Sequence, residues 1–344
     1  MWKRWGLLIL VLLMGCGPTR PFPTSPTITP TILLPTATAT ATLTMTPTQT
    51  AVPTATATPT VTATVTAAPT ATNTPEPTAT IALTNTPEAQ TAVPAITQQS
   101  TVQRWQGVAE YSFFSPSRQQ EIFFTLYTPP GYEQSDERYP VLYFLHGSQG
   151  SHILFWNAIS REVEAANEDA GAWLSQLIEI GQLPPFIVAA PRRPDGAWNE
   201  ANEALVTQEL IATVDGHWRT IPNRNGRSLA GFSLGAAGTM RYAALHPDLY
   251  CNAMPMAESG VDDAASFWEQ NVTAVLESGL EVALVVGELD MRGVNASTAV
   301  DQLLTELNIP HQLRIVPDVP HNFGQLYNQI GVWALQFHAA CWQE

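Results

Sequence analysis

Apolar and polar residues alternate along two stretches early in the folded part of the chain, residues 106–114 and 121–127. A period of two is typical of β-strands with one buried face, so these stretches predict an antiparallel strand pair. The segment Thr128-Pro-Pro-Gly-Tyr132 follows and has the composition of a turn. The folded region is therefore expected to begin with a hairpin.

Apolar runs and helical patterns then take turns along the chain. A short run without polar positions is typical of a strand buried on both faces, as in a parallel sheet covered by helices. This alternation after an antiparallel start predicts an α/β fold with a mostly parallel central sheet and helices on both faces. The expected strands are 141–145, 186–190, 229–230, 252–256, 282–286 and 312–316, and the expected helices are 162–181, 203–218, 236–245, 298–307 and 323–342.

The first residues have the features of an export signal. A basic start precedes an apolar run at 6–14, which is far shorter than the roughly 20 residues of a membrane-spanning helix. The run ends in Leu13-Met-Gly-Cys16, which resembles a bacterial lipobox. We expect Cys16 to be lipidated and the protein to be anchored on the extracytoplasmic side of a bacterial membrane. The alternative is an ordinary signal peptide that happens to contain a cysteine.

Residues 18–100 are dominated by threonine, alanine and proline, with 14 prolines, one aromatic residue and three charged residues. Such a segment has too little apolar surface to offset the entropy lost on ordering. We therefore divide the chain into a signal peptide with lipobox at 1–16, a disordered linker at 17–103 and one α/β catalytic domain at 104–344.

Charge and cysteine content narrow the possible partners. Residues 101–344 hold 28 acidic and 12 basic residues, a formal charge of −16, which argues against nucleic acid and against direct adhesion to anionic lipid. No H-E-x-x-H motif or cysteine cluster is present, so we expect neither a metal nor another cofactor. Cys251 and Cys341 either form a disulfide or remain two buried thiols.

The segment Gly231-Phe-Ser-Leu-Gly235 lies between an expected strand and an expected helix. Strand, G-x-S-x-G and helix together are the pattern of a nucleophile elbow, which makes the Ser233 hydroxyl a candidate nucleophile. Side chains at 231 and 235 would collide across the sharp turn, which explains both glycines. The alternative is a glycine-rich turn with no chemistry.

Two further residues complete a candidate catalytic triad. Sites in parallel sheets lie at the carboxyl ends of strands, and His321 follows the last expected strand at that edge. The other six histidines lie in helical patterns, at a helix end, at the amino end of a strand or ahead of the nucleophile. Asp290 also follows a strand, and the order Ser233, Asp290, His321 is that of α/β-hydrolases. Glu288 and Glu258 remain alternative acids.

A tetrahedral intermediate also needs oxyanion donors, for which we select the backbone N–H groups of Leu234 and Ser148. Leu234 follows the nucleophile, and Ser148 lies in the loop His146-Gly-Ser-Gln-Gly150 after an early strand. Phe155, Trp156 and Trp198 fall in segments expected to be loops at the same edge. They are candidates for an acyl or sugar pocket, and core packing is the alternative.

Taken together, these segments resemble the putative-esterase family of α/β-hydrolases, which includes esterase D, feruloyl and acetyl esterase modules, enterochelin esterases and mycolyltransferases. The resemblance covers essentially 105–344. It is carried, in order, by Tyr127-Thr-Pro-Pro-Gly-Tyr132, Tyr139-Pro-Val-Leu-Tyr-Phe-Leu-His-Gly147, Glu209-Leu-Ile, Gly231-Phe-Ser-Leu-Gly235, His246-Pro-Asp-Leu-Tyr250, Gly287 to Asp290, and His321.

The resemblance implies the α/β-hydrolase fold, a triad of Ser233, Asp290 and His321, and an oxyanion hole formed by the Ser148 and Leu234 amides. With the export signal, we expect hydrolysis of a small-molecule or carbohydrate ester outside the cytoplasm, through an acyl-enzyme. One departure is visible, since the family often has S-M-G-G where this chain has Ser233-Leu-Gly-Ala236. Two alternatives keep the same fold: an acyltransferase to a sugar hydroxyl, and an inert surface-binding lipoprotein.

Overall fold

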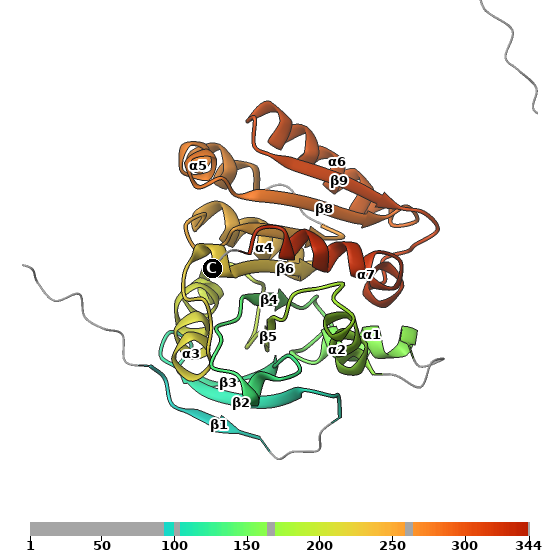
Figure 1. The fold of residues 1–344 in the computed structure, drawn as a ribbon. Coiled ribbons are helices and arrows are strands. Elements are labelled where there is room, and N and C mark those ends of the chain that lie inside the picture. The colour runs from blue at the N-terminus through green and yellow to red at the C-terminus, as the bar shows by residue number, and fades with distance from the viewer. Residues whose placement is uncertain (1–92, 100–103, 164–168, 259–263, 343–344) are drawn as a thin grey trace, which may run out of the picture. The chain divides into compact units, whose positions relative to one another are not determined.

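The computed structural model of the chain describes residues 93–99, 104–163, 169–258 and 264–342, all within the compact unit Ala82–Glu344 (Figure 1). Cys16 and most of the predicted linker lie outside the described residues. None of the helices in the described ranges combines the length and the apolar character that a membrane crossing requires.

A mixed sheet forms the centre of this unit, with nine strands among the described residues, in the order β1-β2-β3-β5-β4-β6-β7-β8-β9. The pairs β1–β2, β2–β3 and β3–β5 are antiparallel. The remaining pairs, β5–β4, β4–β6, β6–β7, β7–β8 and β8–β9, are parallel. The α/β prediction is thus confirmed. The strands are β1 (Ile96–Gln98), β2 (Val108–Ser115), β3 (Gln120–Tyr127), β4 (Val141–Leu145), β5 (Ile187–Pro191), β6 (Arg227–Phe232), β7 (Asn252–Met256), β8 (Glu281–Gly287) and β9 (His311–Val316).

Helices cover both faces of the sheet because the central strands are apolar on both sides. On β4, Tyr143 and Leu145 pack into one hydrophobic layer, and Leu142 and Phe144 pack into the other. The first layer contains α3, α4, α5 and α6, and the second contains α1, α2 and α7. The helices are α1 (Leu154–Val163), α2 (Ala170–Glu179), α3 (Leu210–His217), α4 (Leu234–Leu245), α5 (Ala264–Ser278), α6 (Met291–Glu306) and α7 (Phe323–Ala339).

Several predicted boundaries differ from the structure, and two of the differences change how the chain is divided. Strand β1 lies inside the range 17–103 that was predicted as disordered linker, and it pairs with β2 through Ile96 opposite Phe113. The helix predicted at 162–181 begins later in the structure, as α2, and the first two residues of the predicted range are the end of a separate helix, α1. Asp169 caps α2 by accepting the Ala172 N–H at 2.9 Å, which gives this helix a start of its own.

The alternatives for the two cysteines are also resolved, because Cys251 and Cys341 form a disulfide with a Cα–Cα distance of 5.9 Å. Cys251 directly precedes β7, and Cys341 follows α7. The bond therefore ties the end of the last helix to the amino edge of the parallel strands.

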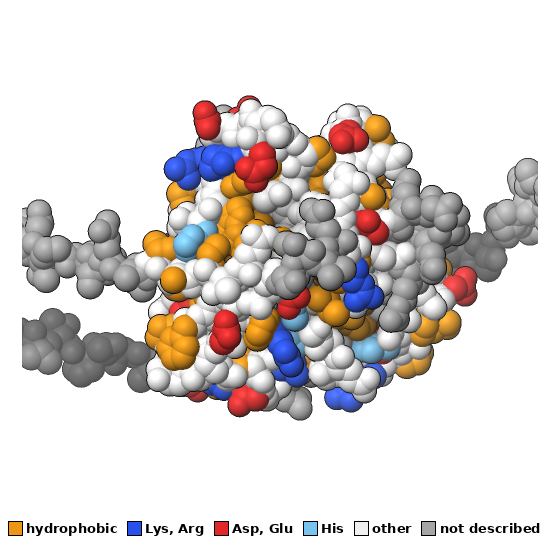
Figure 2. Space-filling view, turned by 90° about the horizontal axis from the view of Figure 1, so that it is seen from below, with side chains coloured by type: hydrophobic (Ala, Val, Ile, Leu, Met, Phe, Trp, Pro, Cys, Tyr) orange, Lys and Arg blue, Asp and Glu red, His pale blue; other side chains and the backbone are white. Residues whose placement is uncertain are grey.

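The face seen in Figure 2 carries acidic side chains scattered among apolar, uncharged polar and basic ones.

Candidate active site

Ser233 occupies the sharp turn between β6 and α4, with φ 56° and ψ −115°. A positive φ is strained for a residue with a side chain and persists only where the surroundings hold it. Here the Ser233 N–H donates to the Met256 carbonyl at 2.8 Å, and the Ser233 carbonyl accepts the Ala236 N–H at 2.9 Å. The neighbouring strand and the first turn of α4 thus hold the hydroxyl at the carboxyl edge of the sheet.

The two glycines of the motif allow this turn to pack. A Cβ placed on Gly231 would lie 2.2 Å from the Gly235 carbonyl oxygen, and a Cβ on Gly235 would lie 1.9 Å from the Leu145 carbonyl oxygen. Only glycine fits at either position without moving backbone. The second contact brings the start of α4 directly against the end of β4.

The structure brings Ser233, His321 and Asp290 together. The Ser233 Oγ lies 2.9 Å from His321 Nε2, and His321 Nδ1 lies 2.5 Å from Asp290 Oδ2. An ionised carboxylate only accepts, so Nδ1 carries the proton and Nε2 is free to accept from the serine hydroxyl. Asp290 is 8% exposed, whereas the His321 side chain is 41% exposed.

Asp290 is held in place by the helix that it begins. Its Oδ1 caps α6 by accepting the Gly293 N–H at 3.0 Å, which leaves Oδ2 for His321. The alternative acids are placed differently. Glu288 is exposed and accepts the Asp318 N–H at 3.2 Å, and Glu258 is buried at the end of β7. Of the three carboxylates, Asp290 is the one that is hydrogen-bonded to His321.

The two proposed oxyanion donors flank the nucleophile. Leu234 is the first residue of α4, where a backbone N–H has no acceptor within the helix. A Cβ on Gly147 would lie 3.4 Å from the Ser233 Cβ, so the loop that continues to Ser148 passes directly beside the serine. Two backbone N–H groups, one from a helix and one from a loop, are therefore available to stabilise negative charge on a substrate oxygen beside Ser233.

His146 sets the conformation of that loop, a role that the sequence analysis missed. Its Nε2 accepts the Arg193 backbone N–H at 3.1 Å, so its proton resides on Nδ1, which donates to the Gly147 carbonyl at 2.7 Å. Burial lowers the pKa of His146 to about 4, which keeps the ring neutral and able to accept. In a trans peptide the N–H points opposite to the C=O, so holding the Gly147 carbonyl also orients the Ser148 N–H. The signal available in the sequence was the His-Gly pair after a strand.

The pocket predicted from Phe155, Trp156 and Trp198 is wrong, because all three side chains are core residues. Phe155 and Trp156 belong to α1 and are 1% and 0% exposed, and the Trp156 indole donates to the Thr125 hydroxyl at 2.9 Å. Trp198 is 2% exposed and lies against α4. None of them faces a space that a substrate can enter.

A cavity of about 660 Å³ opens at the opposite edge of the sheet. Its walls include Tyr139 and Pro140, which precede β4, together with Pro185 before β5 and Trp342 after α7. This cavity lies at the amino ends of the strands and is separate from the Ser233 site.

A serine, an aspartate and a histidine in this chain order, hydrogen-bonded in series at the carboxyl edge of a mixed sheet, define a serine hydrolase of the α/β-hydrolase class. Residues 115–339, well over half of the chain, match the family described as "Putative esterase", and the chain belongs to this family. The resemblance drawn from the sequence is thereby confirmed, and the protein is a serine esterase.

Known proteins similar to this chain include several feruloyl esterases. An endo-1,4-beta-xylanase/feruloyl esterase of Xylanibacter ruminicola is 27% identical over 156 residues, which are 42% of this chain and 20% of that protein, so the chain matches about a fifth of its length. A ferulic acid esterase structure aligns with a TM-score of 0.59 and 19% identity over 69% of this chain and 98% of its own. A feruloyl esterase module from Clostridium thermocellum, complexed with sinapinate, aligns with a TM-score of 0.55 and 16% identity over 73% and 90%.

Proposed function

We propose that this esterase hydrolyses a small acyl ester outside the cytoplasm, through an acyl-enzyme formed on Ser233. The observation that carries the proposal is His321, which bridges the Ser233 hydroxyl and the Asp290 carboxylate at 2.9 and 2.5 Å. The contact with Ser233 provides the weakly nucleophilic hydroxyl with a general base, and the contact with Asp290 fixes the tautomer of His321.

In the first half of the reaction, Ser233 Oγ attacks the ester carbonyl carbon as His321 Nε2 takes the hydroxyl proton. The carbonyl electron pair moves onto oxygen, where the N–H groups of Leu234 and Ser148 stabilise it. The C–O bond to the alcohol then breaks, and the alcohol leaves with the proton from His321. Asp290 keeps its negative charge and stabilises the imidazolium throughout.

In the second half, water replaces the alcohol. His321 removes a proton from the water as its oxygen attacks the acyl carbon, and the second tetrahedral intermediate collapses to release the acid and restore Ser233.

The proposed substrate is an acetyl, feruloyl or similar ester of a small molecule or carbohydrate. The feruloyl esterase activity named for the Xylanibacter ruminicola relative supports this class. An extracytoplasmic location is supported by the apolar run at 6–14 and by the Cys251–Cys341 disulfide, since disulfides persist in oxidising compartments. Attachment through a lipid on Cys16 belongs to the same proposal. Incorporation of labelled palmitate that is lost in Cys16→Ser tests it.

The test of the activity is turnover of p-nitrophenyl acetate by the wild type and by Ser233→Ala. We expect the variant to lose all turnover above the buffer rate while its melting temperature changes little, because the deleted hydroxyl is half-buried and its hydrogen bond is to the partly exposed His321. Ser135→Ala, distant from the site in the loop before β4, is the matched control and should keep full activity. Turnover retained by Ser233→Ala rejects the proposal, and a product ester formed from an added sugar acceptor would indicate transfer in place of hydrolysis.

A further inference from the structure

The two halves of the proposed oxyanion hole come from elements that are separate in the chain. Ser148 belongs to the loop after β4, and Leu234 begins α4, more than 80 residues later. Both N–H groups must point at one oxygen atom, and productive sites hold such groups within about 0.5 Å. Some part of the fold must therefore set the spacing between this loop and this helix.

Trp198 lies at the junction of the two elements. Its indole N–H donates to the His146 carbonyl at 2.8 Å, and the rings of Trp198 and His146 meet edge to face with centroids 5.3 Å apart. On its other side, a Cβ placed on Gly238 of α4 would lie 2.3 Å from the Trp198 Cβ. The residue thus touches both the loop and the helix, and it does so within the core.

The segment that carries Trp198 makes a second contact with the oxyanion loop. The Arg193 backbone N–H donates to His146 Nε2 at 3.1 Å, and its guanidinium reaches the Ser148 carbonyl at 3.4 Å. The segment from Arg193 to Trp198 therefore contacts His146 through its ring and its carbonyl, and also reaches Ser148.

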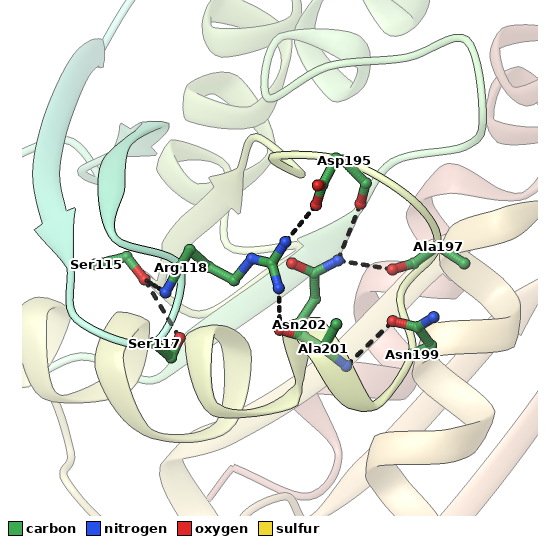
Figure 3. A network of polar contacts seen from close by, with 8 residues as sticks. All are labelled: Ser115, Ser117, Arg118, Asp195, Ala197, Asn199, Ala201 and Asn202. Atoms are coloured by element: carbon green, nitrogen blue, oxygen red, sulfur yellow. Dashed lines mark hydrogen bonds and ion pairs between the residues drawn. The ribbon is translucent and has the colours of Figure 1, made fainter.

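A polar network fixes this segment in place (Figure 3). Arg118, in the turn between β2 and β3, is paired with Asp195 and donates to the Ala201 carbonyl at 2.8 Å. The Asn202 amide donates to the carbonyls of Asp195 and Ala197, at 3.1 and 2.7 Å. Arg118 of the β2–β3 hairpin therefore binds the chain on both sides of Trp198, at Asp195 and at Ala201.

We propose that Trp198 is a positioning residue that sets the distance between the two oxyanion donors, and that Arg118 acts through it. The inference rests on the proposed function, since it assigns the Ser148 and Leu234 N–H groups to the oxyanion. Loss of the indole N–H leaves the buried His146 carbonyl without this partner and lets the oxyanion loop move relative to α4. The base and the acid are untouched.

The test compares Trp198→Phe with Trp156→Phe. Both tryptophans are buried, and each makes one hydrogen bond through its indole N–H, but the Trp156 partner is Thr125, outside the oxyanion loop. Removal of one oxyanion donor lowers kcat by about 10²–10³-fold, and displacement of a donor should lower it by part of that, about tenfold. We expect this loss for Trp198→Phe with KM unchanged, and less than a twofold change for Trp156→Phe.

A second measurement distinguishes displacement of an oxyanion donor from a general loss of order in the active site. Phosphonylation by a small organophosphonate also places negative charge on an oxygen in the oxyanion hole, so its rate should fall in parallel with kcat in Trp198→Phe. The pH at half-maximal kcat/KM should stay at the wild-type value, because the contacts of His321 do not change. Equal kcat losses in the two tryptophan variants, or a loss confined to KM, would overturn the proposal.

If Trp198→Phe does not fold, Arg118→Gln decides the question at the surface end of the network. We expect kcat to fall about threefold with KM unchanged, and an unchanged kcat overturns the proposal. Wild-type turnover that survives in Ser233→Ala would reject the proposed function itself. Ser233-dependent turnover combined with an inert Trp198→Phe substitution rejects only the positioning role.

Discussion

Replacement of Asp290 by asparagine should stop catalysis while leaving the fold intact. The side-chain carbonyl of the introduced asparagine can still accept the Gly293 N–H that Asp290 Oδ1 accepts now, so α6 keeps its cap. The new amide group would then face His321 Nδ1, which lies 2.5 Å from the present carboxylate oxygen, and would donate where the carboxylate accepts. The imidazole is forced into the tautomer with its proton on Nε2, which cannot take the Ser233 proton.

A triad with the wrong tautomer loses about 10⁴-fold in kcat, equivalent to roughly 5 kcal/mol of transition-state stabilisation. Loss of the charge at the start of α6 should lower the free energy of unfolding by only about 0.3–1 kcal/mol. The assay is steady-state hydrolysis of p-nitrophenyl acetate, with the urea midpoint measured on the same preparations.

Glu288→Gln is the matched control, because it removes the same negative charge at a position two residues before Asp290. The Glu288 side chain is exposed and accepts the Asp318 N–H, so it has no contact with His321 to lose. We expect its kcat to stay within twofold of the wild type. A loss below tenfold in Asp290→Asn, or a larger loss in Glu288→Gln, would show that the acid has been misassigned.

Two predictions concern stability. Burial lowers the pKa of His338 to about 3, against 6.5 in the unfolded chain. As the pH falls below 6.5, the unfolded state therefore binds a proton that the folded state does not. The free energy of unfolding then drops by up to about 1.4 kcal/mol per pH unit. The free energy of unfolding from urea titrations at pH 7 and 5 should therefore fall about 2 kcal/mol more in the wild type than in His338→Gln, and equal falls would contradict the assignment. Cys341→Ser opens a cross-link between residues 90 apart and should lower the free energy of unfolding by roughly 3–5 kcal/mol in guanidinium titrations. A fall below about 1 kcal/mol would show that the disulfide contributes less than a cross-link of this length should.

Ser233, Asp290 and His321 could be selected from the sequence because each follows closely on a strand. In a parallel sheet the carboxyl ends of strands share one edge, so position along the chain translates into position in space. The parallel strands β4, β5 and β8 could be predicted because each is an apolar run that is almost entirely buried.

Residues whose role depends on packing could not be read in this way. In α1 the buried Phe155, Trp156 and Ile159 lie within ten residues, too short a stretch for a helical period to be clear. The place of Trp198 depends on the absence of a side chain at Gly238, forty residues later, and a pattern search does not join such positions.

Strand β1 was missed for a different reason. It has three residues beside a Thr- and Pro-rich segment, and part of what holds it is backbone pairing, such as the Gln99 N–H donated to the Glu110 carbonyl at 2.8 Å. Backbone hydrogen bonds are open to almost any residue, so they leave little trace in composition.

The central claim is that His321 and Asp290 make the Ser233 oxygen the nucleophile. Its most direct test is the intact mass of the folded protein after reaction with a fluorophosphonate, followed by peptide mapping of the adduct. We predict one adduct per chain, located on Ser233, and its absence when the protein is first unfolded in urea. An adduct on another residue, or no adduct on folded protein that is otherwise intact, would contradict the account.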